Sequence, residues 1–202
     1  MIEHKRIFIN GQWVESEAVE SIAVVNPATE DIVAWVPSGG ENDVHRAAQA
    51  ASAAFDSWSR SPIAERVEIF RKMARLTEAR ADEITRSIVT ELGYPITWAA
   101  KSQTAGAVEE LEIIAKTLQQ IAWTEQVGNT QVSREPSGVV AAITAWNAPL
   151  RSVISKAGAA IAAGCTVVLK PSEVAPLTAF IFAEITAQAG LPPGVFLSLI
   201  HI

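Results

Sequence analysis

The sequence predicts an α/β fold with an open parallel sheet. Two apolar runs rich in β-branched residues, GVVAAITAW from residue 138 and TVVL over residues 166–169, lack polar alternation, which is typical of strands buried on both faces. Helical stretches follow them at residues 150–163 and 177–189. The order strand, helix, strand, helix is the βαβ arrangement of parallel sheets, so we expect two adjacent parallel strands here.

The first part of the chain predicts short β-ribbons. In FINGQWV, Asn10-Gly11 stands between apolar residues, and both residues tolerate the positive φ of a type I′ hairpin turn. Two more short strands are expected at residues 22–25 and 31–36, because the turn-rich segment NPATE separates them.

A helical segment follows the ribbons. Apolar residues recur three and four positions apart over residues 44–58, which predicts an amphipathic helix. A second helix is expected to begin with Ser61 as its cap and to stop at Gly93, with Thr77 as a candidate break.

A third long helix is predicted over residues 96–123, which are rich in Glu, Gln, Ala and Leu, and Gly128 is expected to close it. Polar and apolar residues then alternate over residues 126–135, which indicates exposed, partly polar strands.

Composition and charge exclude several classes of protein. The 202 residues are 49% hydrophobic and 19% charged, which suits a packed domain rather than a disordered chain. The 16 Lys and Arg against 22 Asp and Glu give a net charge of −6 with no basic cluster, so no nucleic-acid partner is expected. His4, His45 and His201 form no close pair for a metal, and the single Cys165 excludes an internal disulfide and a cysteine-rich zinc site.

The sequence also predicts a soluble, cytoplasmic protein. The first residues, MIEHKR, lead into a short strand rather than an apolar signal segment. The longest stretch of apolar or small residues, 157–169, is shorter than the ~20 residues that cross a bilayer. One free thiol fits a reducing compartment, and no membrane partner is expected.

Polar residues follow the two predicted parallel strands, at the edge where open α/β sheets bind ligands. Asn147 follows the first strand, and an amide fixed there could stabilise negative charge that develops on a substrate oxygen. The alternative is an asparagine that closes a loop before Pro149. Lys170 and Glu173 follow the second strand and could hold the hydroxyls or phosphate of a nucleotide, or form only a Pro-Ser turn with two solvated charges.

Two further residues invite a functional interpretation. Lys156 stands in an otherwise apolar, small-residue stretch, so it either extends to solvent or lies near a functional cleft. Cys165 lies at the start of the second strand, opposite the edge where chemistry belongs, and is expected to be a small core residue. The sequence contains neither a G-x-G-x-x-G fingerprint nor a P-loop.

Six segments carry a family resemblance over residues 8–196. They are FINGQWV, NPATEDIVAWVP, ELGYPI, SGVVAAITAWNAPL, AAIAAGCTVVLKPSEVAPLTA and LPPGVF, in this order. Together they resemble the amino-terminal part of the NAD(P)-dependent aldehyde dehydrogenase superfamily. The most specific part is ITAWNAPL followed, at the family's interval, by AAGCTVVLKPSE.

The resemblance implies a Rossmann-like domain that binds NAD, with NADP as an alternative, without the usual Gly-rich turn. The residues that it implies for the cofactor are Thr144, Ala145, Trp146, Lys170, Pro171, Ser172 and Glu173. Asn147 matches the family's oxyanion-hole amide, which polarises the aldehyde carbonyl. Lys156 matches a lysine with a proton-relay role in some members. No metal site is implied.

The chain also departs from the family pattern. Ala145 and Ala148 stand where Pro and Phe are more usual, and Cys165 where Asn is frequent. Family members are more than twice as long, so residues 1–202 are expected to be a partial cofactor-binding domain without the catalytic domain, its general-base Glu and its nucleophilic Cys. By the resemblance, a ribbon at about residues 124–136 interrupts this domain, projects from it and bridges the subunits of a homo-oligomer. The last residues, LSLIHI, suggest a truncated or misread gene end.

Two functions are therefore open. The first is the NAD-binding portion of an enzyme that oxidises an aldehyde to a carboxylate, with the chain alone inactive. The second is a non-catalytic binding or oligomerisation module. NAD is expected to be preferred, because the Glu173 carboxylate can accept hydrogen bonds from free ribose hydroxyls and would repel a 2′-phosphate, although Lys170 could pair with that phosphate.

Overall fold

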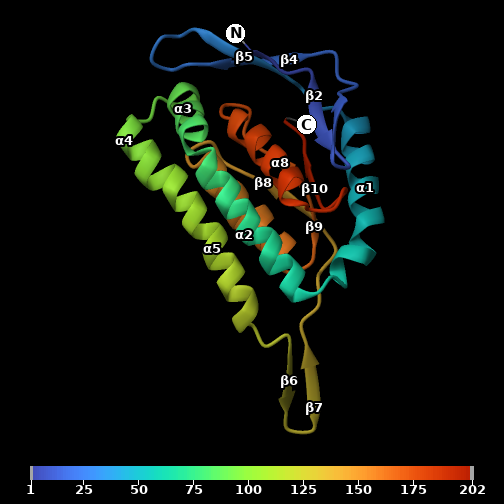
Figure 1. The fold of residues 1–202 in the computed structure, drawn as a ribbon. Coiled ribbons are helices and arrows are strands. Elements are labelled where there is room, and N and C mark those ends of the chain that lie inside the picture. The colour runs from blue at the N-terminus through green and yellow to red at the C-terminus, as the bar shows by residue number, and fades with distance from the viewer. Residues whose placement is uncertain (1, 201–202) are drawn as a thin grey trace.

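A computed structural model describes residues 2–200 and has an α/β architecture (Figure 1). Its strands are β1 (Ile2–Glu3), β2 (Arg6–Ile9), β3 (Gln12–Glu15), β4 (Ser21–Val25), β5 (Ile32–Pro37), β6 (Thr124–Val127), β7 (Thr130–Ser133), β8 (Val139–Ile143), β9 (Thr166–Lys170) and β10 (Phe196–Ser198). Its helices are α1 (Glu41–Ser59), α2 (Ile63–Ala79), α3 (Ala81–Leu92), α4 (Ile96–Trp98), α5 (Ala105–Gln120), α6 (Pro149–Val153), α7 (Ala159–Ala162) and α8 (Leu177–Ala189), with π-helical segments η1 (Ala99–Thr104) and η2 (Ile154–Gly158).

A five-stranded sheet in the order β3-β2-β10-β9-β8 forms the centre. β10, β9 and β8 run parallel, which confirms the predicted βαβ arrangement. β2 pairs antiparallel with β10, so the hairpin around Asn10-Gly11 extends the main sheet instead of forming a separate ribbon. Both hairpin residues have positive φ, 53° and 74°, as the predicted turn requires. β1, β5 and β4 form a smaller sheet.

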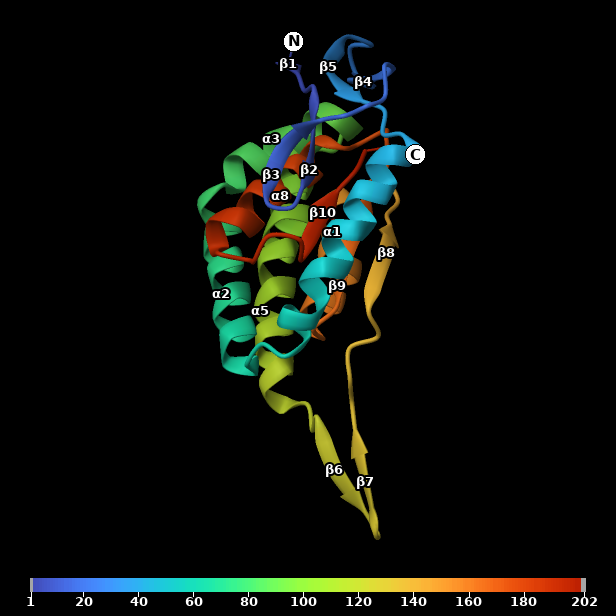
Figure 2. The same cartoon turned by 90° about the vertical axis from the view of Figure 1, so that its right-hand side faces the viewer.

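Helices cover both faces of the central sheet. On one face, Ala47 and Ala51 of α1 pack against Val168 and Leu197, and α1 crosses β9 and β10 in Figure 2. Successive side chains of a strand point to opposite faces, so Val167 and its alternate neighbours face the other layer. That layer contains α8 and the α6–η2–α7 segment, with α2 and α5 outside it.

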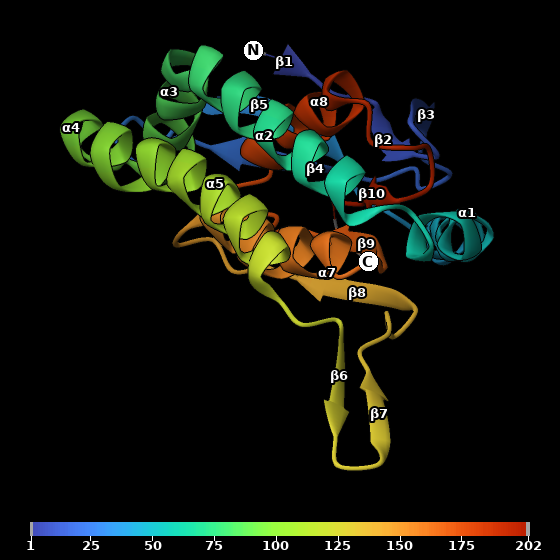
Figure 3. The same cartoon turned by 60° about the horizontal axis from the view of Figure 1, so that its bottom comes forward.

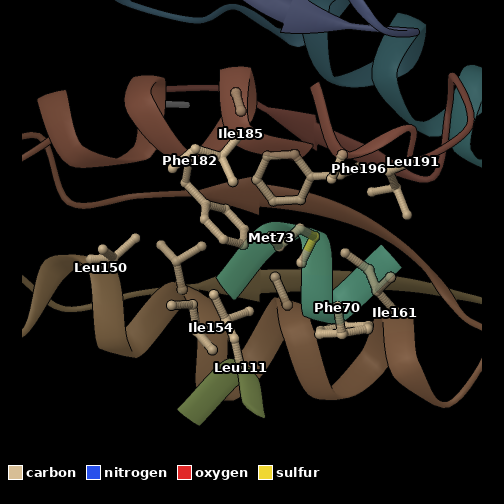
Figure 4. Packing of buried hydrophobic residues seen from close by; sticks show 14 of the residues in the cluster. Phe70, Met73, Leu111, Leu150, Ile154, Ile161, Phe182, Ile185, Leu191 and Phe196 are labelled. Carbon is tan, nitrogen blue, oxygen red and sulfur yellow. The ribbon is translucent and has the colours of Figure 1, made fainter. Parts of the chain in front are cut away.

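The larger hydrophobic core lies between that second layer and the sheet. Figure 4 shows side chains from α2, α5, α6, α8 and β10 meeting there. Its largest fully buried members include Phe70, Phe182, Phe196, Leu111 and Ile154. Burying such side chains stabilises the fold by about 1.5–3 kcal/mol each, so this core fixes the strands that carry the candidate site.

β8 differs from its prediction. It is the last strand of the sheet, and side chains on one of its faces are exposed, with Ile143 at 68% and Val139 at 43%. The expectation of burial on both faces is therefore wrong for β8, whereas β9 is buried on both faces as predicted. The apolar composition of β8 suits a covered strand, but the described residues leave its outer edge unpaired.

Three details of the helices also differ. Ser61 does not cap α2, because its hydroxyl donates to the Trp58 carbonyl, and Pro62 stands at the N-cap position. The break between α2 and α3 falls at Arg80 rather than Thr77, which is buried inside α2. Gly128 does not close α5, which ends at Gln120.

Gly128 instead lies in the turn between β6 and β7. These two strands pair only with each other among the described strands, and their hairpin extends away from the body of the molecule (Figure 3). Its residues are almost all exposed. Over residues 2–200, none of the helices is long and apolar enough to span a membrane.

Candidate cofactor and carbonyl site

The ends of β8 and β9 bring the two candidate segments together. Ile143 is aligned with Lys170 in the parallel register, and the Thr144 N–H donates to the Lys170 carbonyl at 3.1 Å. Residues 144–147 and 170–173 therefore leave the sheet side by side at its carboxyl edge. This is the edge where ligands of open α/β sheets bind.

Residues 144–148 form an open loop after β8. Thr144 is buried, whereas Ala145, Trp146 and Asn147 are exposed, with 55% of Trp146 accessible. Pro149 then starts α6, which suits a residue without a backbone N–H. The Asn147 carboxamide makes no hydrogen bond with any described residue, so both of its N–H groups can be donated to a ligand.

Residues 170–173 form the second loop. The Lys170 ammonium pairs with the Glu173 carboxylate at 2.9 Å, and Lys170 is only 18% exposed. Pro171 and Ser172 are buried, and the Ser172 hydroxyl accepts the Val174 N–H at 3.3 Å. The turn thus holds the charged pair beside the end of β8, with Glu173 the more exposed of the two partners.

Lys156 is not brought to this pair of loops by any polar contact. It lies in η2, is exposed, and forms neither a hydrogen bond nor an ion pair within the described part of the chain. The side chain of Lys156 therefore extends to solvent, and its proton-relay role stays a prediction.

Sequence analysis did not find two residues at the carboxyl end of α3. Tyr94 contacts the first loop, and Glu91 contacts the start of α8, which follows the second loop. The Tyr94 hydroxyl donates to the Asn147 backbone carbonyl at 2.7 Å. The Glu91 carboxyl accepts the Leu177 N–H, at the start of α8, at 2.7 Å and the Ser87 hydroxyl at 3.0 Å. Burial raises the pKa of Glu91 to about 8, against the opposing effect of its hydrogen bonds.

The opposite, amino edge of the same strands is closed. Cys165 is buried there, with its sulfur 3.5 Å from the Ser137 hydroxyl, as expected for a core residue. The buried Arg66 guanidinium donates to the carbonyls of Trp58, Ser59 and Ala162. Burial lowers its pKa.

Within residues 2–200, no cluster of three or more His, Cys, Asp or Glu side chains is arranged to hold a metal ion. His201 lies outside the described residues.

Comparisons with known proteins identify the family of this chain. The profile of the Aldehyde dehydrogenase family matches residues 13–201. The 3-succinoylsemialdehyde-pyridine dehydrogenase of a Pseudomonas species is 41% identical over 197 residues, which cover 97% of this chain and 41% of that protein.

Solved structures are similar over nearly the whole chain. A variant of aldehyde dehydrogenase C from Pseudomonas syringae, in complex with NAD⁺ and octanal, is 42% identical with a TM-score of 0.96, and the match covers 98% of this chain and 41% of that one. A Mycobacterium tuberculosis aldehyde dehydrogenase in complex with NAD⁺ is 37% identical with a TM-score of 0.95, over 99% of this chain and 43% of that one. The present chain thus spans about two fifths of the length of these relatives, and it belongs to the aldehyde dehydrogenase family.

Proposed function

We propose that this chain is the NAD-binding portion of an aldehyde dehydrogenase whose complete form oxidises an aldehyde to a carboxylate. The observation that carries the proposal is the pairing of two strand ends, Thr144 beside Lys170, in a family member. It places an unbonded amide next to a charged pair that suits a nucleotide. Relatives in complex with NAD⁺ support the choice of cofactor.

The residues present fit such a cofactor. The Trp146 ring and residues 144–145 offer a surface for the nicotinamide half, and Lys170 and Glu173 offer a cation and a carboxylate for ribose hydroxyls. Pro171 and Ser172 hold the turn between the two charges. When bound, NAD accepts a hydride from the substrate carbon.

Asn147 is the proposed oxyanion donor. Its free amide N–H groups would donate to the aldehyde oxygen and stabilise the negative charge that grows there during attack on the carbonyl carbon. A donor of this kind contributes about 100- to 1,000-fold to kcat in other enzymes. Lys156 is the proposed proton relay at the surface of η2, although no contact ties it to Asn147.

The chain alone is proposed to be inactive. Aldehyde oxidation through a covalent thioester needs a nucleophilic thiolate at the carboxyl edge. The single cysteine, Cys165, is buried at the amino edge. The exposed apolar face of β8, with Val139 and Ile143, supports an arrangement in which a further part of a longer protein covers that strand. A reduced, unpaired thiol also favours a cytoplasmic location.

Titration of the 202-residue chain with NAD⁺ and NADP⁺ tests the cofactor. We expect NAD⁺ to bind more tightly, because the Glu173 carboxylate would repel a 2′-phosphate. Glu173→Gln is expected to narrow the preference for NAD⁺ over NADP⁺ by about threefold to tenfold, which is the contribution of one ordinary hydrogen bond. Glu83→Gln is the control. It removes a carboxylate of similar exposure that pairs with Arg80 three residues before it, as Glu173 pairs with Lys170, and it should leave the ratio of the two dissociation constants unchanged.

Three results would count against the proposal. If neither nucleotide binds, the cofactor-binding function is wrong. If NADP⁺ binds as tightly as NAD⁺, the preference is wrong, and the Lys170 ammonium then dominates over Glu173. If Glu83→Gln changes the ratio as much as Glu173→Gln, the discrimination does not lie in this loop.

An assembly of several copies is also part of the proposal. Val127 and Val132 lie on the same face of the β6–β7 hairpin, because Val132 is aligned with Glu125, two residues from Val127. Both are exposed, and an isolated two-stranded hairpin is only marginally stable in water. A second copy of the chain that covers this face would bury the two valines and stabilise the hairpin.

Sedimentation can test the hairpin. Val127→Lys with Val132→Lys should weaken self-association, whereas Val19→Lys, at a fully exposed position outside the helices and strands, should not. A chain that associates without nucleotide binding would instead support the second function, a binding or oligomerisation module that keeps the fold without turnover.

A further inference from the structure

The carboxyl end of α3 contacts the loop after β8 and the start of α8, where the loop after β9 ends. Its last residues are Glu91 and Leu92, and Gly93 then ends the helix in the left-handed conformation, with φ of +68°. This turn sends the chain away from the helix axis, so that Glu91 and Tyr94 reach different neighbours. In sequence, these neighbours lie 86 and 53 residues away.

Tyr94 holds the loop after β8. Its hydroxyl donates a 2.7 Å hydrogen bond to the backbone carbonyl of Asn147, while its ring packs against the main hydrophobic core. The bond goes to the main chain, so the Asn147 amide stays available. Because Asn147 is otherwise part of an exposed loop, the hydroxyl restrains the residue whose side chain must be aimed at a substrate oxygen.

Glu91 holds the loop after β9. Its carboxyl is 1% exposed, and it accepts the Leu177 N–H, with a further hydrogen bond from the Thr178 backbone. The first N–H groups of a helix lack partners within the helix, so this carboxyl caps α8. The cap also fixes the downstream end of residues 171–176, the loop that begins beside Lys170.

We propose that Glu91 and Tyr94 are positioning residues for the site: Tyr94 for the nicotinamide and carbonyl loop, and Glu91 for the ribose loop. The proposal rests on the function proposed above. Neither residue touches the reacting atoms, so each acts only through the loop that it holds. The two halves of NAD should therefore respond to the two residues separately.

The 202-residue chain can be titrated with NAD⁺ and with AMP, which has only the adenosine half. Tyr94→Phe keeps the ring and removes the hydroxyl. It is expected to weaken NAD⁺ binding by about threefold to tenfold, the loss of one hydrogen bond, and to leave AMP binding unchanged. Glu91→Ala should weaken both ligands alike, and Glu91→Gln, which keeps an acceptor oxygen, should restore them.

Thr166→Val is the matched control. It removes another long-range hydroxyl-to-carbonyl hydrogen bond, 2.9 Å to Ala51, at the closed edge of the sheet. It should lower stability and change neither Kd. Equal losses for NAD⁺ and AMP in Tyr94→Phe, or the same losses in Thr166→Val, would overturn the proposal.

Hydrogen exchange separates this proposal from the function on which it rests. Tyr94→Phe should speed amide exchange at residues 144–148 and leave residues 171–177 unchanged. If the unmodified chain binds neither ligand, the proposed function fails. The amide exchange rates then still test whether Tyr94 restrains residues 144–148. Unchanged exchange at residues 144–148 in Tyr94→Phe would contradict it even if Glu91→Ala does not fold.

Discussion

The two ends of the same parallel strands have opposite characters. At the amino edge, Arg66, Gly164 and Cys165 are buried, and a Cβ added at Gly164 would collide with its neighbours. At the carboxyl edge, Trp146 and Asn147 are exposed, and the nearby Lys170 and Glu173 are partly exposed. The closed edge contributes buried contacts to the fold, whereas the open edge leaves polar side chains accessible, as the proposed cofactor site requires. Substitutions at the two edges should therefore affect different measurements.

The largest effect on stability is expected at Gly164. Its φ is +95°, and a Cβ there would lie 2.7 Å from both the Arg66 Nη1 and the Pro136 Cγ. Gly164→Ala should lower the free energy of unfolding by about 3 kcal/mol or more, from backbone strain and overpacking together. Gly190, at φ +87° with nothing within 4 Å of a Cβ, is the control, and Gly190→Ala should cost about 1 kcal/mol. If urea unfolding gives the same loss of free energy of unfolding for Gly164→Ala and Gly190→Ala, the close packing around Gly164 does not contribute to the effect.

A slightly smaller loss is expected from Arg66→Met. This change leaves the carbonyls of Trp58, Ser59 and Ala162 without the donors that they now have, at a cost of about 2–3 kcal/mol. Arg60→Met, which removes an exposed partner of Asp56, should cost less than about 0.5 kcal/mol. The same denaturation series measures both variants, and similar losses would show that the closed edge is not the stabilising one.

The smallest effect is expected at Glu91 when the pH rises by one unit, from 6 to 7. Its pKa of about 8 in the folded protein exceeds the usual value near 4.5, so the folded state retains a proton that the unfolded state has lost. The resulting stabilisation is complete below about pH 4.5 and is lost as the pH rises to about 8, at about 1.4 kcal/mol per unit. Relative to Glu91→Gln, the unmodified chain should therefore become less stable between pH 6 and 7. Parallel stability curves for the two proteins would contradict the raised pKa.

The sequence predicts the framework of the site better than its surroundings. Two unalternated apolar runs sufficed to place Asn147 and Lys170 at one sheet edge, because parallel strands end together. β8 was expected to be buried on both faces because its composition is apolar, and composition alone does not show that it is the last strand of the sheet. The added hairpin β2–β3 and strand β10 depend on pairings that no local pattern specifies.

Glu91 and Tyr94 could not be predicted from the sequence for a similar reason. Glu91 resembles any acidic residue near a helix end, and Tyr94 resembles a turn residue before Pro95. Their contacts with Leu177 and Asn147 bridge long stretches of chain and exist only once α3 packs beside α8 and the end of β8. A pattern of spacing could not reveal them.

Amide chemical shifts of the chain with and without NAD⁺ test the contrast between the two edges most directly. We predict that NAD⁺ shifts the amide signals of residues 144–147 and of Lys170, Ser172 and Glu173, and leaves those of residues 164–166 in place. Shifts centred on residues 164–166, with none at residues 144–147, would contradict the assignment of the cofactor to the open edge.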